Sequence, residues 1–276
     1  MVGVVLASAP AKVILVGEHF VVENQPAIAV AVELRARARA TPRSDDRVVI
    51  RSANLGLECS FAQGEEVGVR ELRPLGVVVR EVQEAAGSWR GLELTVESDI
   101  PVAAGMGSSA AVAVAATLAV SRLLGLKLSR EEVSRIAYEA ERLVHGKPSG
   151  IDNTISTYGG AIVYRRSEGF LPLDCDFTGY KLVLADSGIP RSTGEMVARV
   201  RELRARHPRI MEPLYHAAGR LTIEAAKALR DGDFARLGEL MNINHGLLSA
   251  IGVSNEKLEQ LIYAARRAGA LGAKIT

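Results

Sequence analysis

A glycine-rich stretch at residues 101–114, PVAAGMGSSAAVAV, limits the fold of this chain more than any other segment. It follows the strand-like run 92–96 and leads directly into the apolar segment 110–124. Glycine adopts positive φ without strain and lets a ligand approach the backbone closely. A helix beginning at Ser108 or Ser109 would present free N–H groups and the positive end of its dipole, which together favour phosphate. The stretch therefore predicts a strand–loop–helix unit with an anion site, although an ordinary turn with an N-capping serine would leave the same pattern.

Two common nucleotide motifs are excluded by the details of this loop. No Gly-Lys-Ser/Thr follows it, so it is not a Walker A loop. The third glycine of the dinucleotide-binding pattern is also missing. A phosphate site here would have to belong to another class of nucleotide-binding protein.

Composition and charge describe a globular chain with a full core. Of its 276 residues, 48% are hydrophobic and 24% charged, and the net charge of +2 provides no basic field for nucleic acid. The longest apolar run, 110–120, falls short of the ~20 residues that span a bilayer. The two cysteines, Cys59 and Cys175, form neither a disulfide framework nor a zinc pattern. We therefore expect a cytoplasmic protein without nucleic-acid or membrane partners.

Hydrophobic periodicity predicts a mixed α/β (α+β) chain. Helices are expected at 76–86, 110–124, 129–145, 194–207, 212–230, 233–251 and 254–268. Strands are expected at 2–9, 12–16, 27–40, 47–51, 59–61, 92–96, 161–164, 181–185 and 273–275. Ser129 and Glu132 form a capping box at the start of one helix. Because the pattern becomes mostly helical near Asp176, we predict two domains, 1–175 and 176–276.

Polar residues at two places near the N-terminus are candidates for a functional role. Lys12 lies between Ala11 and Val13 in a predicted strand, where a buried ammonium would need an anion, although an edge lysine facing water is the simpler interpretation. Glu18 and His19 are adjacent in a turn at the end of that strand. An isolated histidine is more often structural than functional, so only its neighbours make this turn a candidate.

Two further carboxylates follow the glycine-rich loop. Glu141 lies on the flank of the apolar stripe of helix 129–145, where it would either reach water or ligate a metal in a cleft. Asp152 lies within the glycine-punctuated segment 146–160, where an Asx turn or a helix cap is the ordinary role for aspartate.

These residues together provide the parts that phosphoryl transfer needs. The reaction requires a cradle for the phosphates, oxygen ligands for Mg²⁺, a cation for developing charge and a carboxylate to orient the hydroxyl. Because Mg²⁺ keeps several waters, one serine hydroxyl and one carboxylate from the protein would suffice.

Three motifs in this order resemble the GHMP superfamily of small-molecule kinases. They are APAKVILVGEH, PVAAGMGSSAA and ERLVHGKPSGIDNTISTYGGA, with IPRSTGEMV at 189–197 as a fourth matching stretch. The resemblance covers nearly the whole chain, and within the superfamily it is to mevalonate kinases of archaeal or bacterial type.

The resemblance implies a GHMP kinase fold. Residues 1–175 would form a domain like domain 2 of ribosomal protein S5, with an unusual left-handed crossover. Residues 176–276 would form a ferredoxin-like domain, with the ATP and substrate sites in the cleft between the two. Homodimers are common among such kinases, but the sequence does not specify the oligomeric state.

The resemblance also implies an activity, namely ATP-dependent phosphorylation of the C5 hydroxyl of mevalonate in isoprenoid biosynthesis. Asp152 would be the catalytic base, and Lys12 would make the hydroxyl more acidic and steady the transferring phosphoryl group. Ser109 and Glu141 would hold Mg²⁺. Glu18, His19 and Thr193 would line the substrate pocket. ATP would be bound by Ser98, Val102, Ala103, Ala104, Gly105, Met106, Gly107, Ser108 and Ser109.

Other members of the superfamily remain alternatives. In galactokinases the GEH element is usually followed by an acidic residue, whereas here Phe20, Val21 and Val22 form an apolar wall. A phosphomevalonate kinase would need more basic residues for the substrate phosphate, and a diphosphomevalonate decarboxylase fits the lysine strand and the GEH element less well. A regulatory nucleotide-binding module would be expected to lack the catalytic residues, but Lys12 and Asp152 are both present.

Two features depart from the family pattern. The phosphate loop reads VAAGMGSS where relatives often have PGAGLGSS, and the exchange of leucine for methionine is conservative. The final residues, LGAKIT, resemble the strand that precedes a third, GAGGGG-like motif, which the sequence lacks. We therefore expect the natural protein to continue for several tens of residues beyond Thr276.

Overall fold

The computed structural model describes residues 3–101, 105–146, 148–189 and 193–276. The chain forms two compact units, each assembled from separate stretches of sequence. The described residues of the first unit fall within 1–12, 31–102 and 106–159, and those of the second are Gly105 and residues within 13–30 and 160–276. The division at 175/176 stays a prediction for the domains. The two units are considered in turn.

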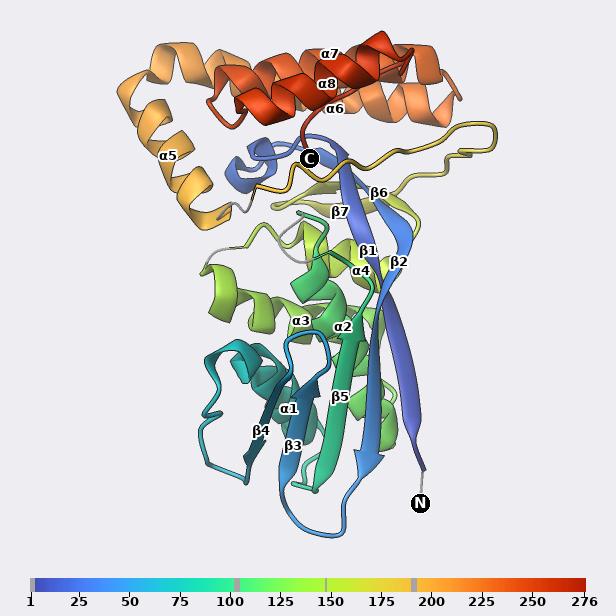
Figure 1. Ribbon diagram of the computed structural model, residues 1–276, viewed down its shortest axis with the longest axis vertical. Helices are drawn as coiled ribbons and strands as arrows, with labels where there is room; N and C mark the ends of the chain where they lie inside the picture. Colours follow the sequence, from blue (N-terminus) through green and yellow to red (C-terminus); the bar gives the residue numbers. More distant parts are fainter. Residues whose placement is uncertain (1–2, 102–104, 147, 190–192) are drawn as a thin grey trace. The chain divides into compact units, whose positions relative to one another are not determined.

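The first unit contains a mixed sheet in the strand order β4-β3-β5-β2, with β1 paired to β2 (Figure 1). Antiparallel pairs join β3 to β4 and β2 to β5, whereas β3 and β5 run parallel. The strands are β1 (Val5–Val16), β2 (Ala27–Pro42), β3 (Val48–Ser52), β4 (Leu57–Phe61) and β5 (Leu92–Ser98). Strand β1 replaces the two separate strands expected at 2–9 and 12–16, because Pro10 does not interrupt it.

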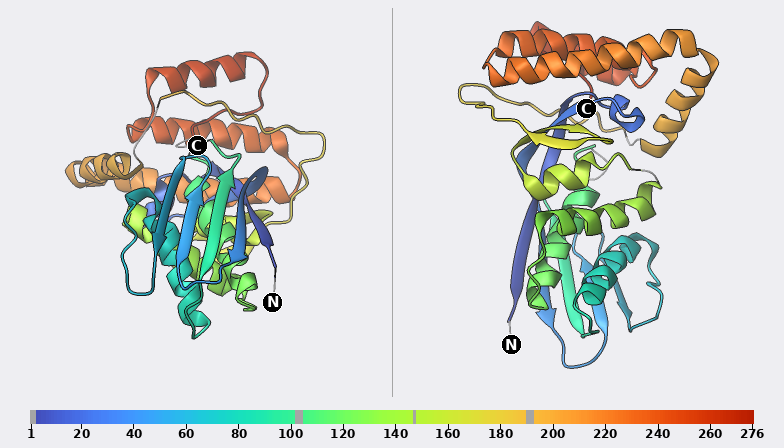
Figure 2. Two further views of the ribbon diagram at one scale, coloured as in Figure 1. Left: turned by 60° about the horizontal axis from the view of Figure 1, so that its bottom comes forward. Right: turned by 180° about the vertical axis from the view of Figure 1, so that it is seen from behind.

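Helices cover one face of this sheet (Figures 1 and 2). They are α1 (Arg73–Ala85), α2 (Ser108–Leu123), α3 (Arg130–His145) and α4 (Ile151–Tyr158), with a short 3₁₀ helix η2 (Arg70–Leu72) before α1. Helix α2 contacts α1, α3, α4 and β5, and most of its residues are buried around its whole circumference. Its alanines allow this close packing, so the core holds the start of α2, directly after the glycine-rich loop, in a fixed place. The capping box of Ser129 and Glu132 at the start of α3 is confirmed.

The second unit is mainly helical. Its helices are η1 (Phe20–Glu23), α5 (Thr193–Arg206), α6 (Pro208–Arg230), α7 (Phe234–Ala250) and α8 (Glu256–Arg267), and its strands β6 (Ala161–Arg165) and β7 (Gly169–Pro172) extend from the first residues of β2. One core cluster forms around Phe20 and Tyr215, whose rings meet edge to face at 5.1 Å between centroids. A second forms around Ile28, Leu229 and Leu237.

Two predicted strands are wrong. Residues 181–185 form no strand and are exposed, with Val183 82% accessible, because no neighbouring strand pairs with them among the described residues. Residues 273–275 form no strand because side chains take the backbone groups that a ladder would use. The Ala273 N–H donates to Asn242 Oδ1, and the Ala273 carbonyl accepts from Arg266.

Other elements were not predicted from the sequence. Strand β7 was not expected, and residues 151–158, expected to be a loop, form helix α4. Among the described helices, none combines the length and apolar character needed to cross a membrane.

Candidate active site

An ion pair joins the two predicted catalytic residues in the first unit. Lys12, on strand β1, is only 6% exposed, and its Nζ lies 3.1 Å from Asp152 Oδ1. The Lys12 backbone N–H also donates to the Met106 carbonyl at 3.0 Å. The free-energy cost of burying the ammonium is thus offset by its pairing with a carboxylate, whose side chain remains 32% exposed. The strand, the glycine-rich loop and helix α4 therefore meet at one charged pair.

The glycine-rich loop lies directly against this pair. Gly107 has φ of 70° and stands at the N-cap of α2. A Cβ atom at this position would lie 3.0 Å from Lys12 Cγ and 3.7 Å from Asp152 Cβ. Only glycine satisfies both the left-handed backbone and the close approach of Lys12. The free N–H groups of α2 consequently begin beside the Lys12–Asp152 pair, which suits an anionic group.

Helix α4 holds Asp152 through contacts made by its neighbours. Gly150 starts the helix with φ of 88°, and the Thr154 hydroxyl donates to the Gly150 carbonyl at 2.7 Å. Asn153 Nδ2 donates to both the carbonyl and the hydroxyl oxygen of Ser134 on α3, at 3.1 and 2.8 Å. Asp152 therefore sits in the first turn of a helix that is fastened to α3, and a carboxylate is favourable at that end of the helix dipole.

Two oxygen groups form a second contact beside the loop. The Ser109 hydroxyl, in the first turn of α2, donates to Oε1 of Glu141 on α3. Glu141 is 3% exposed, so its carboxylate is buried next to the loop. A hydroxyl and a carboxylate are hard oxygen ligands of the type that Mg²⁺ prefers, and phosphate and water complete such sites. In the described part of the chain, His, Cys, Asp and Glu side chains form no group of three or more that could hold a metal ion.

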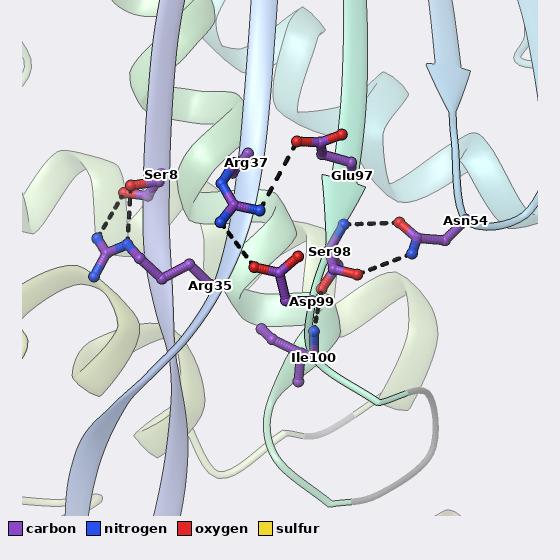
Figure 3. Close-up of polar contacts among 8 residues, drawn as sticks. All are labelled: Ser8, Arg35, Arg37, Asn54, Glu97, Ser98, Asp99 and Ile100. Carbon is purple, nitrogen blue, oxygen red and sulfur yellow. Dashed lines mark hydrogen bonds and ion pairs between the residues drawn. The ribbon is translucent and has the colours of Figure 1, made fainter.

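Ser98, predicted to contact ATP, is fixed by Asn54, which the sequence analysis did not identify (Figure 3). Asn54 Nδ2 donates to the Ser98 carbonyl at 2.9 Å, and the Ser98 N–H donates to Asn54 Oδ1 at 2.7 Å. Ser98 Oγ accepts from the Ile100 N–H at 3.1 Å and lies 3.5 Å from Ser108 Oγ. The side chain of Asn54 thus continues the sheet pairing beyond β3 and ties the end of β5 to the start of α2. No periodicity marks such a turn residue in advance.

Charged side chains on β2 support the same end of β5 (Figure 3). Arg37 lies 2.8 Å from Asp99 and 3.8 Å from Glu97. Arg35 donates to the hydroxyl oxygen of Ser8 on β1 at 3.0 Å. These pairs are largely exposed, so they contribute little stability individually. Arg37 thus lies beside the residues at which the chain leaves β5 toward the loop.

The predicted substrate residues belong to the second unit. Glu18 is 5% exposed and contacts Asn244 and Lys274, and His19 follows it with φ of 58°. Thr193 is the first residue of α5.

The remaining predicted ATP-binding residues are only partly described. Val102, Ala103 and Ala104 lie outside the described residues. Gly105 has φ of 72°, and Met106 is buried. The structure therefore brings Lys12, Asp152, Gly107, Ser109 and Glu141 together in one unit, whereas Glu18, His19 and Thr193 are found in the other.

Comparison with known proteins matches two segments of the chain to family models. Residues 73–160 match the family model of the GHMP kinases N terminal domain, and residues 225–276 match that of the GHMP kinases C terminal. The mevalonate kinase of Thermococcus gammatolerans is 46% identical over 99% of this chain and 85% of its own length. That of Pyrococcus horikoshii is 44% identical over 100% of this chain and 86% of its own length.

Solved structures show the same fold. The L. major mevalonate kinase in complex with R-mevalonate has a TM-score of 0.80 at 30% identity, over 99% of this chain and 83% of its own. The Methanococcus jannaschii mevalonate kinase, at 22% identity, has a TM-score of 0.82 over 98% of this chain and 86% of its own, and supports the fold alone. The GHMP kinase architecture and the sequence relationship agree over almost the entire length, so this chain belongs to the mevalonate kinase family of GHMP kinases.

Proposed function

We propose that the protein transfers the γ-phosphoryl group of ATP to the C5 hydroxyl of mevalonate, giving 5-phosphomevalonate and ADP. The observation that carries this proposal is the Lys12–Asp152 ion pair beneath Gly107, at the start of α2. This pair supports the proposal because it provides a carboxylate and a cation beside the segment that would bind phosphate. Membership of the mevalonate kinase family supports mevalonate as the alcohol.

Asp152 would act as the base. Its carboxylate accepts the proton of the C5 hydroxyl as the oxygen forms a bond to the γ-phosphorus. The bond between that phosphorus and the oxygen bridging to the β-phosphate breaks, and ADP leaves with the electron pair. Lys12 holds Asp152 in place, and its positive charge would stabilise the negative charge that develops on the reacting oxygens in the transition state.

Ser109, Glu141 and the loop would hold the nucleotide. The N–H groups at the start of α2 donate to phosphate oxygens, and Ser98 supports the end of the strand leading to the loop. Ser109 Oγ and Glu141 Oε1 are the protein oxygens that would hold Mg²⁺, which would neutralise phosphate charge when bound. Glu141 is buried beside the loop, so its negative charge is available to a cation rather than to bulk water.

The turn at Glu18 and His19, and Thr193 in α5, are the residues proposed to take part in recognition of the alcohol. A hydrogen-bonding side chain such as that of His19 discriminates between polar groups on a substrate. The apolar residues Phe20 and Val21, which follow the turn, are buried and give it a rigid support.

A coupled assay of ADP release tests the proposal directly. The purified protein would be given ATP and Mg²⁺ with mevalonate, galactose, homoserine or phosphomevalonate in separate reactions. We expect kcat/KM for mevalonate to exceed that for each other alcohol by at least about 10³-fold, since a site built to bond a polar group rejects analogues lacking it. Equal or greater turnover of any other alcohol would assign the protein to a different GHMP kinase activity.

A further inference from the structure

A buried ion pair lies at the turn that carries the proposed substrate residues. The side chains of Lys274 and Glu18 are 3% and 7% exposed, and Lys274 Nζ donates to Glu18 Oε1. Asn244 Nδ2, on α7, donates to Glu18 Oε2 at 2.9 Å. Both carboxylate oxygens of Glu18 therefore already have donors from the protein. The carboxylate is consequently engaged within the fold rather than offered to a ligand.

The segment that carries Lys274 is itself fixed by two helices. Asn242 on α7 donates to the Leu271 carbonyl at 3.3 Å and accepts from the Ala273 N–H at 3.1 Å. Arg266 on α8 donates to the Ala273 carbonyl at 2.9 Å. These contacts replace the hydrogen bonds of a strand and hold the backbone immediately before the lysine. The Lys274 ammonium therefore contacts Glu18 from a backbone that these hydrogen bonds hold in place.

The turn next to Glu18 has an unusual backbone. Gly17 has φ of 96°, and a Cβ there would lie 2.6 Å from the Pro26 carbonyl oxygen. His19 is not glycine and yet has φ of 58°. Such a conformation is disfavoured for an ordinary residue and persists only when its surroundings hold it. Glu18 is the residue between these two positions, and its side chain is the one tied to α7 and to the 271–276 segment.

The amide of Asn244 supports the same interpretation. The residue is fully buried, and its Oδ1 has no hydrogen-bond partner among the described residues. An unpaired buried carbonyl is costly, so the side chain keeps its orientation because its NH₂ group donates to Glu18. The buried NH₂ group of Asn244 therefore needs an acceptor at position 18, and the Glu18 carboxylate supplies it.

We propose that Lys274 and Asn244 are positioning residues that act through Glu18 to hold His19 in its positive-φ conformation for substrate recognition. The inference rests on the proposed function, which assigns His19 to the alcohol. Within that assignment His19 contacts the substrate, whereas Glu18 sets the shape of the turn. The same network links the 271–276 segment to the substrate turn.

A double-mutant cycle between Glu18→Gln and Lys274→Met tests the proposal. Each single change leaves one buried polar group without its partner, whereas the double change removes both charges together. We expect each single variant to raise KM for mevalonate about tenfold, with KM for ATP nearly unchanged. The double variant should have a KM for mevalonate no higher than that of the more impaired single variant, since the effects of coupled residues are not additive. The double variant also keeps the test valid if a single variant fails to fold.

Three further variants sharpen the result. Lys274→Arg, which keeps the charge, should recover most of the affinity for mevalonate. Asn244→Asp, which places a second carboxylate beside Glu18, should reproduce the Lys274→Met defect. Glu224→Gln is the matched control, because Glu224 pairs with Lys227 and Arg236 on the surface of the same unit and should change neither KM.

An NMR measurement separates this inference from the proposed function. The ring signals of His19, assigned with His19→Gln, should shift in Glu18→Gln and Lys274→Met but not in Glu224→Gln, whether or not the protein phosphorylates mevalonate. Shifted signals with no mevalonate turnover in the wild type would leave the positioning network intact and remove the substrate assignment. Unshifted His19 signals, or losses in the cycle that multiply as independent effects, would overturn the positioning role.

Discussion

Gly107 packs so closely on Lys12 that a single added methyl group would lie 3.0 Å from Lys12 Cγ and 3.2 Å from its Cε. The loop glycine and the buried ammonium therefore occupy complementary space. Because Lys12 also pairs with Asp152, any displacement at Gly107 is transmitted to the proposed base. This relationship leads to the first of five predictions.

Gly107→Ala should impair both folding and catalysis. The left-handed backbone alone costs an L-residue about 1–2 kcal/mol, and the contact with Lys12 adds displacement of the ion pair. Gly125→Ala is a matched control, since Gly125 has φ of 77° but nothing within 4 Å of a new Cβ. Urea unfolding should show a loss of stability in both variants, whereas kcat/KM should fall only in Gly107→Ala. Equal kcat/KM in the two variants would show that the contact with Lys12 is unimportant.

Asp152→Asn should remove the base while keeping the shape of the side chain. Loss of a general base costs on the order of 10²–10⁴ in kcat, and KM for ATP should change little. Steady-state kinetics with saturating mevalonate measures this directly. Asp231→Asn, an exposed change at the end of α6, should retain wild-type kcat. A value for Asp152→Asn within about threefold of wild type would exclude the assignment.

Lys12→Met should lower kcat by removing the cation that lies beside the reacting oxygens. Asp152 is 32% exposed, so water can hydrate its carboxylate when the ammonium is gone, and the fold should persist. Thermal unfolding and kcat measured on the same sample separate the two effects. Lys127→Met, at an exposed position, serves as the control. Normal turnover in Lys12→Met would reduce the lysine to a structural partner of Asp152.

Ser109→Ala and Glu141→Gln should each raise the concentration of Mg²⁺ needed for half-maximal activity, together with the apparent KM for ATP. Each change removes one of the two protein oxygens proposed to hold the ion, and Mg²⁺ depends on few protein ligands. A titration of Mg²⁺ at fixed free ATP distinguishes this from a general loss of activity. Glu139→Gln on the same helix, where Glu139 pairs with Arg142, should leave the requirement unchanged. An unchanged Mg²⁺ requirement in both test variants would contradict the proposed ligand set.

The stability contributed by Glu259 should depend on pH. The hydrogen bond from the Ser254 hydroxyl, followed by that from His245, lowers the pKa of Glu259 below its ordinary value. A group whose pKa is lower in the folded protein contributes stability above its unfolded pKa, near 4.3, and that contribution is lost as pH falls through the folded pKa. Glu259→Gln should therefore destabilise the protein at pH ~7 and differ little from wild type at a pH below the folded pKa of Glu259, where the wild-type carboxyl is also neutral.

Urea midpoints at the two pH values measure this difference. Glu256→Gln, at an exposed position in the first turn of the same helix, is the control and should show the same small effect at both. A destabilisation by Glu259→Gln that is equal at both pH values would mean that the loss comes from packing rather than from charge.

Much of the local structure could be predicted because the determinants are local. The capping box at Ser129 and the apolar segment that becomes α2 follow from side chains a few residues apart. The prediction of strands at 181–185 and 273–275 was wrong because an apolar alternation cannot form a strand without a neighbouring strand to pair with. Lys274 was missed, although it lies between apolar residues just as Lys12 does, and the same signal could have marked it.

The sequence by itself determined the identities and the order of the chemical groups: the lysine strand, the glycine-rich loop with its two serines, Glu141 and Asp152, and through them the family. Only the tertiary structure decided which groups meet, because residues 140 apart in the chain, such as Lys12 and Asp152, come into contact only when β1, α2 and α4 pack together. The same reason applies to Glu18, Asn244 and Lys274. A buried charge cannot choose its partner from local sequence, since the partner is supplied by whichever distant segment the core brings beside it.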